Sequence, residues 1–411
     1  MFYKYRKICS LTGRKAGLSL CLILCLALSL LTGCAGQSGQ DDAEDKNASV
    51  ETEGSSQADQ ESNTSDDGSY ATTEEQEVTT SALSTETVEG QTDMIQASQE
   101  VFAMDTYMTV TAYGSEAAEA VTEAVSEIQR LDTLWSVGNM ESEIARINNS
   151  GSEILSEETA ALIQGSLDLY EMTEGRFDIT IYPLMDEWGF TTQNYKVPTQ
   201  ERIDELLQKV DASAMDFDAD SRTLTLPEGV QIDLGGIAKG YTSAHIMEIF
   251  DKYDVVSGLV SLGGNVQAYQ SKVDGSAWRV GIENPDTTVG QLKNVDYVGV
   301  LSIVNKAVIT SGGYERYFEE DGQTYHHILD PATGYPSDSG LISVTIVSED
   351  GLLADGLSTS LFIMGQEKAI DFWREHKDAF DAVLIDKDGN ITITAGLQDA
   401  FESNLTYQVA E

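Results

Sequence analysis

One stretch of this chain cannot build a hydrophobic core, and it limits where a folded domain can lie. Residues 35–99 hold 16 acidic side chains against a single base, Lys46, with one aromatic residue, Tyr70, and no proline. Dense like charge and low hydrophobicity cannot offset the entropy that a chain loses on ordering. We therefore expect a disordered acidic linker over residues 34–100 and a compact domain over residues 101–411.

Residues 1–33 have the opposite character, because they contain five bases and no acid. An apolar run at residues 18–31 follows the bases and is too short to cross about 30 Å of hydrocarbon comfortably, which is typical of a secretory signal peptide. The run ends in Leu-Thr-Gly before Cys34, which resembles the lipobox of bacterial lipoproteins. This resemblance implies a lipid on Cys34 and an exported protein, lipid-anchored to the membrane on the extracytoplasmic side. An ordinary cleavable signal and an uncleaved anchor are the alternatives.

Cysteine usage and charge narrow the possible partners. The other three cysteines lie within residues 1–33, so the domain has no disulfide and depends on its core, or on core and ligand. The whole chain carries 24 basic and 69 acidic residues, a net charge of -45, which repels nucleic acid and excludes it as a partner. Without the five N-terminal bases and the linker's net -15, about -35 remains on the domain. An anionic ligand would therefore need a local source of positive charge.

Hydrophobic periodicity in residues 101–411 predicts both strands and helices. They mix without a regular βαβ rhythm, so we expect an α+β fold with mixed or antiparallel sheets and flanking helices. The predicted strands cover residues 109–113, 223–226, 299–304 and 341–347, and the predicted helices cover residues 117–135, 157–173, 199–209, 240–253 and 368–377.

Paired glycines recur where predicted strands end, at residues 235–236, 263–264 and 312–313. The first pair joins a predicted strand ending at Asp233 to a predicted helix that carries Lys239. Glycines at such a junction let the backbone approach a phosphate, and the helix N-terminus offers free N–H groups. These turns indicate a floor for a large polyanionic ligand. A plain turn with Lys239 in solvent is the alternative.

Two other segments carry side chains suited to chemistry. A loop at residues 325–336 contains two prolines and two histidines, one of which is His327. Histidine is suited to proton transfer near neutral pH. Asp355, with Ser358 and Thr359 three and four residues later, could place three oxygens on one helical face, which suits Mg²⁺. The alternatives are a surface histidine and an N-cap role for Asp355.

The apolar segment 175–190 is expected to form a strand that is either core or one wall of a pocket for a planar ring.

Taken together and in chain order, eight segments of the sequence resemble the ApbE family, the FAD:protein FMN transferases. They span most of the predicted domain and are Met104–Val110, Ser142–Asn148, Gly175–Asp178, Asp233–Gly240, Ser261–Asn265, Thr310–Tyr314, His327–Pro331 and Ala354–Thr359.

The resemblance implies a single catalytic unit of two lobes that binds FAD and Mg²⁺. It implies transfer of FMN to a Thr or Ser hydroxyl of an acceptor flavoprotein, exported or part of a membrane redox complex, with release of AMP. Gly138 stands where relatives often place an aromatic residue, and glycine has no side chain that could stack there. The implied FAD contacts are Met104, Gly138, Arg176, Phe177, Asp178, Asp233, Lys239, Ser311, Gly312, His327 and Ile328, and the implied metal ligands are Gly236, Asp355, Ser358 and Thr359.

Cleaving a pyrophosphate needs charge neutralisation, here by Lys239, and a base for the attacking hydroxyl. His327 is the first choice as base on pKa grounds, and Asp330 is the second. The same residues would serve an FAD pyrophosphatase that makes FMN and AMP, or a flavin-binding lipoprotein without catalysis, so these two functions remain open.

Overall fold

The computed structural model describes residues 80–88 and 94–411. Internal contacts separate residues 1–72 from residues 73–411, and only the second unit is considered below. The predicted signal peptide, Cys34 and most of the predicted linker lie outside the described residues. Within them, no helix has both the length and the hydrophobicity needed to cross a membrane.

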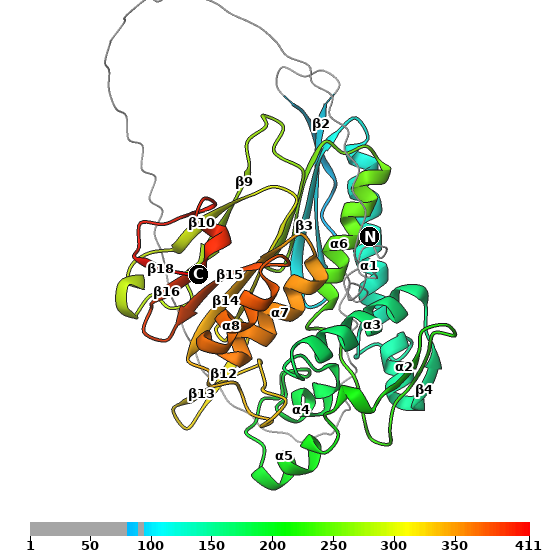
Figure 1. Cartoon of the computed structure of the whole chain (residues 1–411). Coiled ribbons are helices and arrows are strands. Elements are labelled where there is room, and N and C mark those ends of the chain that lie inside the picture. The colour runs from blue at the N-terminus through cyan, green and yellow to red at the C-terminus, as the bar shows by residue number, and fades with distance from the viewer. Residues whose placement is uncertain (1–79, 89–93) are drawn as a thin grey trace, which may run out of the picture. The chain divides into compact units, whose positions relative to one another are not determined.

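A ten-stranded sheet forms the centre of the described part and confirms the α+β class (Figure 1). Neighbouring strands are antiparallel, except for the last pair, β16 and β18. In spatial order the strands are β1 (Ser84–Thr87), β2 (Ile95–Ala103), β3 (Thr106–Gly114), β7 (Ser257–Leu262), β8 (Asn265–Tyr269), β11 (Ala307–Gly312), β14 (Leu341–Ser348), β15 (Asp381–Asp386), β16 (Ile391–Thr394) and β18 (Tyr407–Ala410).

Three smaller sheets flank the large one. The first comprises β17 (Phe401–Glu402), β10 (Tyr297–Ile303) and β9 (Trp278–Glu283); the second, β12 (Tyr317–Glu320) and β13 (Gln323–His326); the third, β4 (Ser152–Ile154), β6 (Thr223–Thr225) and β5 (Asp216–Asp218). The helices are α1 (Ala117–Trp135), α2 (Glu143–Ser150), α3 (Glu157–Met172), α4 (Tyr182–Glu187), α5 (Gln200–Leu207), α6 (Ala238–Lys252), α7 (Gly351–Met364) and α8 (Gln366–His376). All five predicted helices are confirmed, with bounds within two residues of those expected.

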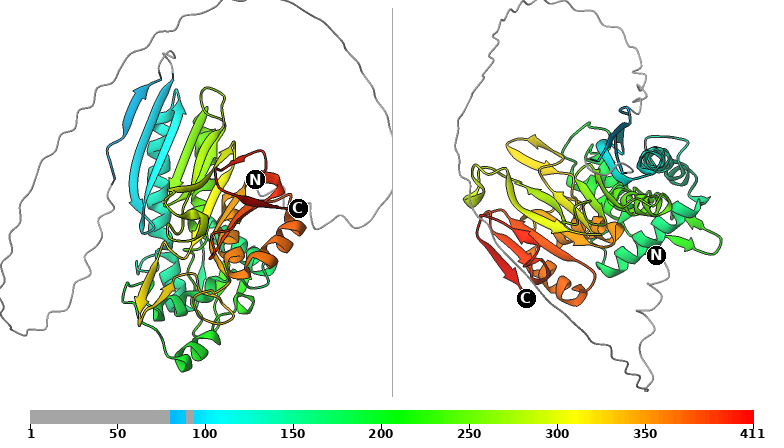
Figure 2. Two further views of the ribbon diagram at one scale, coloured as in Figure 1. Left: turned by 90° about the vertical axis from the view of Figure 1, so that its left-hand side faces the viewer. Right: turned by 90° about the horizontal axis from the view of Figure 1, so that it is seen from above.

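The two faces of the large sheet are covered differently, as Figure 2 shows from two directions. Helices α1, α6, α7 and α8 pack in a row on one face. Strand β11 illustrates the alternation, because Ala307 and Ile309 join the core under the helices, whereas Val308 faces the core shared with β9, β10 and β17. Side chains of period two thus serve two separate cores.

The start of the domain was placed too late in the sequence. Strands β1 and β2 begin before residue 101, and β2 pairs with β3 from Ile95 opposite Gly114. All four β1 side chains are exposed, so composition cannot distinguish this strand from a linker. Backbone pairing with β2 holds it in the sheet instead.

Two predicted strands are also wrong. Segment 175–190 forms a 3-10 turn, Ile179–Ile181, followed by α4, because Asp178 caps the turn and Pro183 suits the first turn of a helix. The segment ending at Asp233 is extended but has no partner strand among the described residues. The side chain of Asn148 replaces a partner strand. Its Oδ1 accepts from the N–H of Ile232 at 2.7 Å, and its Nδ2 donates to the carbonyl oxygen of Ile232 at 2.8 Å.

Candidate active site

A single pocket gathers most of the residues that the sequence analysis assigned to a site. It opens beside the start of α6, the middle of α7, the end of β11 and the loop after β13. Four of the predicted residues, Gly138, Gly312, Asp330 and Ser358, do not line it. The predicted residues that do line it are Met104, Arg176, Phe177, Asp178, Asp233, Gly236, Lys239, Ser311, His327, Ile328, Asp355 and Thr359.

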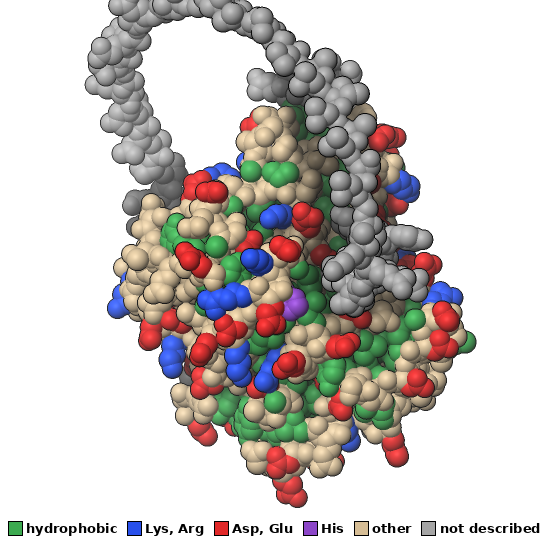
Figure 3. Space-filling model, viewed as in Figure 1, with side chains coloured by type: hydrophobic (Ala, Val, Ile, Leu, Met, Phe, Trp, Pro, Cys, Tyr) green, Lys and Arg blue, Asp and Glu red, His purple; other side chains and the backbone are tan. Residues whose placement is uncertain are grey.

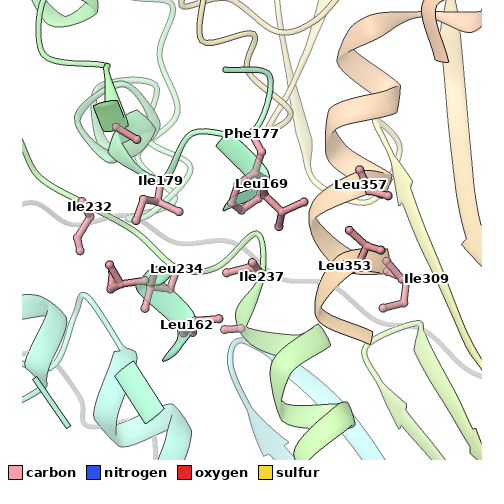
Figure 4. Packing of buried hydrophobic residues seen from close by; sticks show 14 of the residues in the cluster. Leu162, Leu169, Phe177, Ile179, Ile232, Leu234, Ile237, Ile309, Leu353 and Leu357 are labelled. Carbon is pink, nitrogen blue, oxygen red and sulfur yellow. The ribbon is translucent and has the colours of Figure 1, made fainter. Parts of the chain in front are cut away.

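An apolar cluster forms part of the pocket floor, since Phe177 belongs to both, and Figure 4 shows how members of this cluster pack. Phe177, Ile237 and Leu357 are buried members that come from a loop, from the residue before α6 and from α7. Gly236 lies against this floor, and a Cβ on it would approach the Phe177 ring to 3.3 Å. The turn with paired glycines therefore fits closely over an aromatic side chain, as expected where a backbone must approach a ligand.

Helices α6 and α7 cross at two glycines, and this contact positions Asp355. A Cβ on Gly240 would lie 2.3 Å from the carbonyl oxygen of Gly351. The close approach lets the N–H of Gly240 donate to Oδ2 of Asp355 at 2.7 Å. Ile237, the N-cap residue of α6, offers no side-chain acceptor, so Asp355 supplies from α7 the carboxylate that a helix N-terminus favours.

Asp355 is a buried carboxylate with defined partners. Its exposed fraction is 6%, and its Oδ1 accepts a hydrogen bond from Nδ2 of Asn265 at 3.0 Å. Burial raises its pKa, against the charge of Lys239 and the two hydrogen bonds. The N-cap alternative is wrong, because Asp350 caps α7 by accepting from the N–H of Leu353 at 3.1 Å.

Hydroxyl groups lie on the same side of the pocket. The hydroxyl oxygens of Ser311 and Thr359 both belong to pocket residues and are 3.3 Å apart. Ser358, predicted beside them, is fully buried, and its hydroxyl oxygen lies 2.7 Å from that of Ser311 and 2.7 Å from the backbone oxygen of Asp355. The hydroxyl three residues after Asp355 thus contacts this group from behind the pocket wall, whereas Thr359, four residues after it, lines the pocket.

Asp178 and Asp233 line the pocket, but their carboxylates accept hydrogen bonds from neighbouring protein groups and so stabilise the loops that form the pocket wall. Oδ1 of Asp178 accepts from the N–H and the hydroxyl of Thr180, and Oδ2 accepts from the N–H of Ala212. Asp233 accepts from the N–H of Gly235 and so orders the glycine turn. Burial raises the pKa of both carboxyls.

His327 does not have the pKa expected of a base near neutral pH. Burial and the charge of Arg316 lower its pKa to about 3, so the imidazole is neutral. Its Nδ1 lies 3.1 Å from the carbonyl oxygen of Arg316. Nδ1 must therefore donate, which leaves Nε2 as the acceptor. The pKa argument for His327 as first choice is wrong, although its ring still lines the pocket.

Asp330 is held as a structural acid at the rim. Its Oδ1 accepts from the N–H of Ala332 at 2.9 Å and lies 3.5 Å from Nη1 of Arg176. These contacts shape the loop after β13 and bring the guanidinium of Arg176 to the pocket edge. Gly138 and Gly312 also stay outside the pocket wall, but each adjoins a residue that lines it, Val137 and Ser311.

Sequence reasoning missed several pocket residues, namely Asp105, Asp132, Asn265, Glu315 and Arg316. Glu315 is exposed to the pocket, but the surrounding protein raises its pKa to about 7 against the charges of Lys239 and Arg316. Asn265 and the Glu315–Arg316 pair follow glycine turns and could have been found by their position. Asp132 lies inside the pattern of a surface helix and gave no signal.

Across the face shown in Figure 3, Lys and Arg side chains are interspersed with acidic ones. The high net negative charge therefore does not exclude local positive charge, and Arg176, Lys239 and Arg316 supply it at the pocket. Cations, hydroxyls and a glycine turn gathered in one pocket have the chemistry that suits a phosphorylated ligand.

The chain belongs to the ApbE family, whose model matches residues 104–384. Two relatives named FAD:protein FMN transferase are similar to it. The one from Haemophilus influenzae is 30% identical over 69% of this chain and 83% of its own length. The one from Treponema pallidum is 32% identical over 69% and 82%.

Solved structures agree with this assignment. The crystal structure of the ApbE protein from Thermotoga maritima has a TM-score of 0.69 and 31% identity, over 74% of this chain and 99% of that one. The flavin transferase ApbE from Vibrio cholerae has a TM-score of 0.65 and 25% identity, over 75% and 99%. The fold, including its large antiparallel sheet, is therefore that of the family.

Proposed function

We propose that this protein transfers the FMN portion of FAD to a Ser or Thr hydroxyl of an acceptor protein and releases AMP. The observation that carries the proposal is the pocket itself, in which Lys239, Asp355 and His327 meet. Relatives that match most of the chain bear the name of this activity.

The reaction breaks a pyrophosphate bond by attack of a hydroxyl oxygen on the phosphorus of the FMN half. The leaving AMP carries the bridging oxygen, so the pocket must stabilise negative charge on phosphate oxygens. Lys239 and Arg316 provide positive charge for this beside the start of α6. These contributions also counter the repulsion between an anionic substrate and an acidic domain.

The donor set beside Lys239 fits Mg²⁺. Each carboxylate oxygen of Asp355 accepts one hydrogen bond, which leaves lone pairs for a cation. Thr359 and the backbone of Gly236 add oxygens in the same pocket. Within the described residues no three acidic, His or Cys side chains converge, so this site has few protein ligands, as Mg²⁺ often does beside phosphates. Bound there, Mg²⁺ would neutralise phosphate charge.

The attacking hydroxyl must lose its proton to a group in the pocket. Nε2 of the neutral His327 is the acceptor that the Nδ1 bond to Arg316 leaves, so geometry favours it although burial lowers the pKa of the imidazole to about 3. Asp330, by contrast, is engaged by Arg176 and by the N–H of Ala332. We expect His327→Gln to slow transfer more than Asp330→Asn does, measured as AMP release at saturating FAD. The reverse order would transfer the role to Asp330.

One experiment tests the activity. The full chain is incubated with FAD, Mg²⁺ and a candidate acceptor, and AMP and the acceptor's mass are followed together. AMP with a mass gain of one FMN supports the proposal. AMP with no mass gain would show an FAD pyrophosphatase, and neither product would show flavin binding without catalysis. Omitting Mg²⁺ tests the metal in the same assay.

We further propose export and lipid anchoring through Cys34, which rest on the sequence of residues 1–34 alone. The acceptor is then an exported or membrane-bound redox flavoprotein on the same side of the membrane. Cys34→Ala should move the protein from the membrane fraction to the soluble fraction without changing its transfer rate. Retention in the membrane would contradict the anchor.

A further inference from the structure

The hairpin turn between β2 and β3 reaches the pocket with an unfavourable backbone. Ala103 pairs with Thr106, so the turn consists of Met104 and Asp105 alone. Both have positive φ, 48° and 60°, a region where non-glycine residues are strained. Both also line the pocket, so the strain is stored at the site.

Asp132 holds this turn from α1. Its Oδ1 accepts a hydrogen bond from the N–H of Met104 at 3.0 Å, across 28 positions of sequence. The backbone of Met104 thereby gains a charged acceptor in a conformation that it would otherwise avoid, and Met104 lines the pocket.

The placement of Asp132 costs the fold stability in three ways. It lies in the last turn of α1, where the helix dipole disfavours a negative charge. Burial and the nearby charge of Asp105 both raise its pKa. No Lys, Arg or His of the described residues forms an ion pair with it. A local conflict of this kind points to a functional role.

A second turn connects this one to the buried carboxylate. Gly263 and Gly264 join β7 to β8, and a Cβ on Gly263 would lie 2.5 Å from the side chain of Thr106. Asn265 follows at once and donates to Asp355. The two turns therefore pack together, and displacement of the first would be felt at Asp355.

We infer that Asp132 is a positioning residue of the nucleotide pocket, which fixes the Met104–Asp105 turn so that Met104 and, through the neighbouring turn, Asp355 take up their binding positions. This inference rests on the proposed function, because it assigns the pocket to a flavin nucleotide. It adds a residue that acts through the backbone of another.

Binding of FAD to the full chain, followed by flavin fluorescence, tests this role. Asp132→Ala should weaken binding at least about tenfold, the value of one lost hydrogen bond to a charged group. Asp132→Asn keeps an acceptor oxygen but not the charge, so it should lose clearly less affinity than Asp132→Ala does. Asp274→Ala is the matched control, because it removes a turn carboxylate outside the pocket that accepts from the N–H of Ser276.

Glycine at position 105 provides a second test. Since glycine adopts positive φ without strain, Asp105→Gly should restore part of the binding lost in Asp132→Ala when the two are combined. Each variant is compared with the wild type by melting temperature, so that unfolding is not read as weak binding. Unchanged binding in Asp132→Ala, or equal loss in Asp132→Ala and Asp132→Asn, would overturn the inference.

The failure of this inference is distinct from that of the proposed function. If the wild-type chain binds no FAD, the proposed function fails and no variant is informative about it. If the wild type binds FAD and Asp132→Ala binds it equally well, only the role of Asp132 is lost.

Discussion

The two ends of the helix-covered face of the large sheet differ in the kinds of side chain that they bury. Where α1 and α6 pack on β2, β3 and β7, the core consists of apolar side chains, mostly Ala, Val, Ile and Leu together with Met108 and Phe250. Where α7 packs on β11 and β14, the core also borders buried polar groups such as Asp355 and Ser358. We call the first region the apolar end and the second the pocket end.

Buried carboxylates cost stability, because charge must leave water. The apolar end avoids this cost and depends on transfer free energy and packing. The pocket end contains a buried carboxylate, that of Asp355, and hydrogen bonds from Gly240 and Asn265 partly offset the cost of burying it. Substitutions at the apolar end should therefore change stability without activity, and substitution of the buried carboxylate at the pocket end should do the reverse.

The largest effect is expected at the apolar end. Ile246 is fully buried in α6, and Ile246→Ala should lower the free energy of unfolding by about 2 to 5 kcal/mol, because it removes apolar contacts and leaves a cavity. The transfer rate per folded molecule should stay as in the wild type. Urea unfolding and an AMP assay on the same sample measure both. A large loss of rate in the folded fraction would contradict the division.

Asp355→Asn should have the opposite profile. We expect transfer to fall roughly 100- to 1000-fold, the usual effect of removing one electrostatic stabiliser. The free energy of unfolding should change little, because removal of a buried charge offsets the loss of one of the two hydrogen bonds that the carboxylate accepts. The control is Asp350→Ala in the same helix, which removes the N-cap and should cost about 1 kcal/mol of stability while leaving the rate unchanged. If both variants lost stability alone, Asp355 would be structural.

The glycine contact between α6 and α7 gives the next largest effect. Gly→Ala inside a helix normally stabilises it by about 0.5 to 1 kcal/mol. At Gly240 the new methyl would meet the backbone of Gly351, so we expect a loss of about 1 to 3 kcal/mol together with weaker FAD binding. Gly165→Ala in α3 meets only the flexible end of Leu352, and unfolding measurements should show a much smaller change.

Sequence patterns predicted the fold where local physics determines it. The bounds of α1 follow from its hydrophobic period, and of the three paired-glycine turns expected at one site the first, Gly235–Gly236, lines the pocket. The strand expected at Asp233 failed because its hydrogen bonds go to Asn148, 84 positions away, and no local pattern records such a partner.

The candidate site was predicted less completely, for the same reason. Twelve of its residues were found by resemblance and line the pocket. The pKa of His327, by contrast, depends on Arg316 and on burial, which exist only in the folded chain. The link from Asp132 to Met104 crosses from a helix to a hairpin, so no periodicity could indicate it.

A smaller effect concerns pH, and two pocket residues should act with opposite sign. The pKa of His327 falls from 6.5 to about 3 on folding, so the unfolded chain binds more protons between these values. The contribution of His327 to the free energy of unfolding is present above pH 6.5 and is lost as the pH falls from 6.5 toward 3. Glu315, raised from 4.5 to about 7, contributes stability below pH 4.5 that is lost as the pH rises through 7.

Thermal unfolding at pH 7 and pH 5.5 separates the two groups. His327→Gln should reduce the loss on acidification by about 1 kcal/mol. Glu315→Gln should raise the melting temperature at pH 8 relative to the wild type, and by less at pH 5. Identical pH profiles for His327→Gln and the wild type would mean that His327 titrates near its ordinary value.

The smallest effects compare two ion pairs of the same kind. Arg279 makes a bidentate pair with Glu402 at 3.0 and 2.9 Å between exposed strands, and exposed pairs contribute little because water and salt screen them. Arg279→Gln should leave the melting temperature and the Michaelis constant for FAD unchanged. Arg176 makes a longer contact with Asp330, 3.5 Å, but it lines the pocket.

Arg176→Gln should therefore raise the Michaelis constant for FAD by about fivefold or less, the value of one partly exposed charge, with little change in the melting temperature. The rise should shrink at high salt, where the attraction between a guanidinium and a phosphate is screened. Suppose instead that Arg176→Gln left FAD binding unchanged and Arg279→Gln weakened it. Position in the fold would then not determine the effect of a surface charge. The contrast between apolar end and pocket end would then hold only for buried groups.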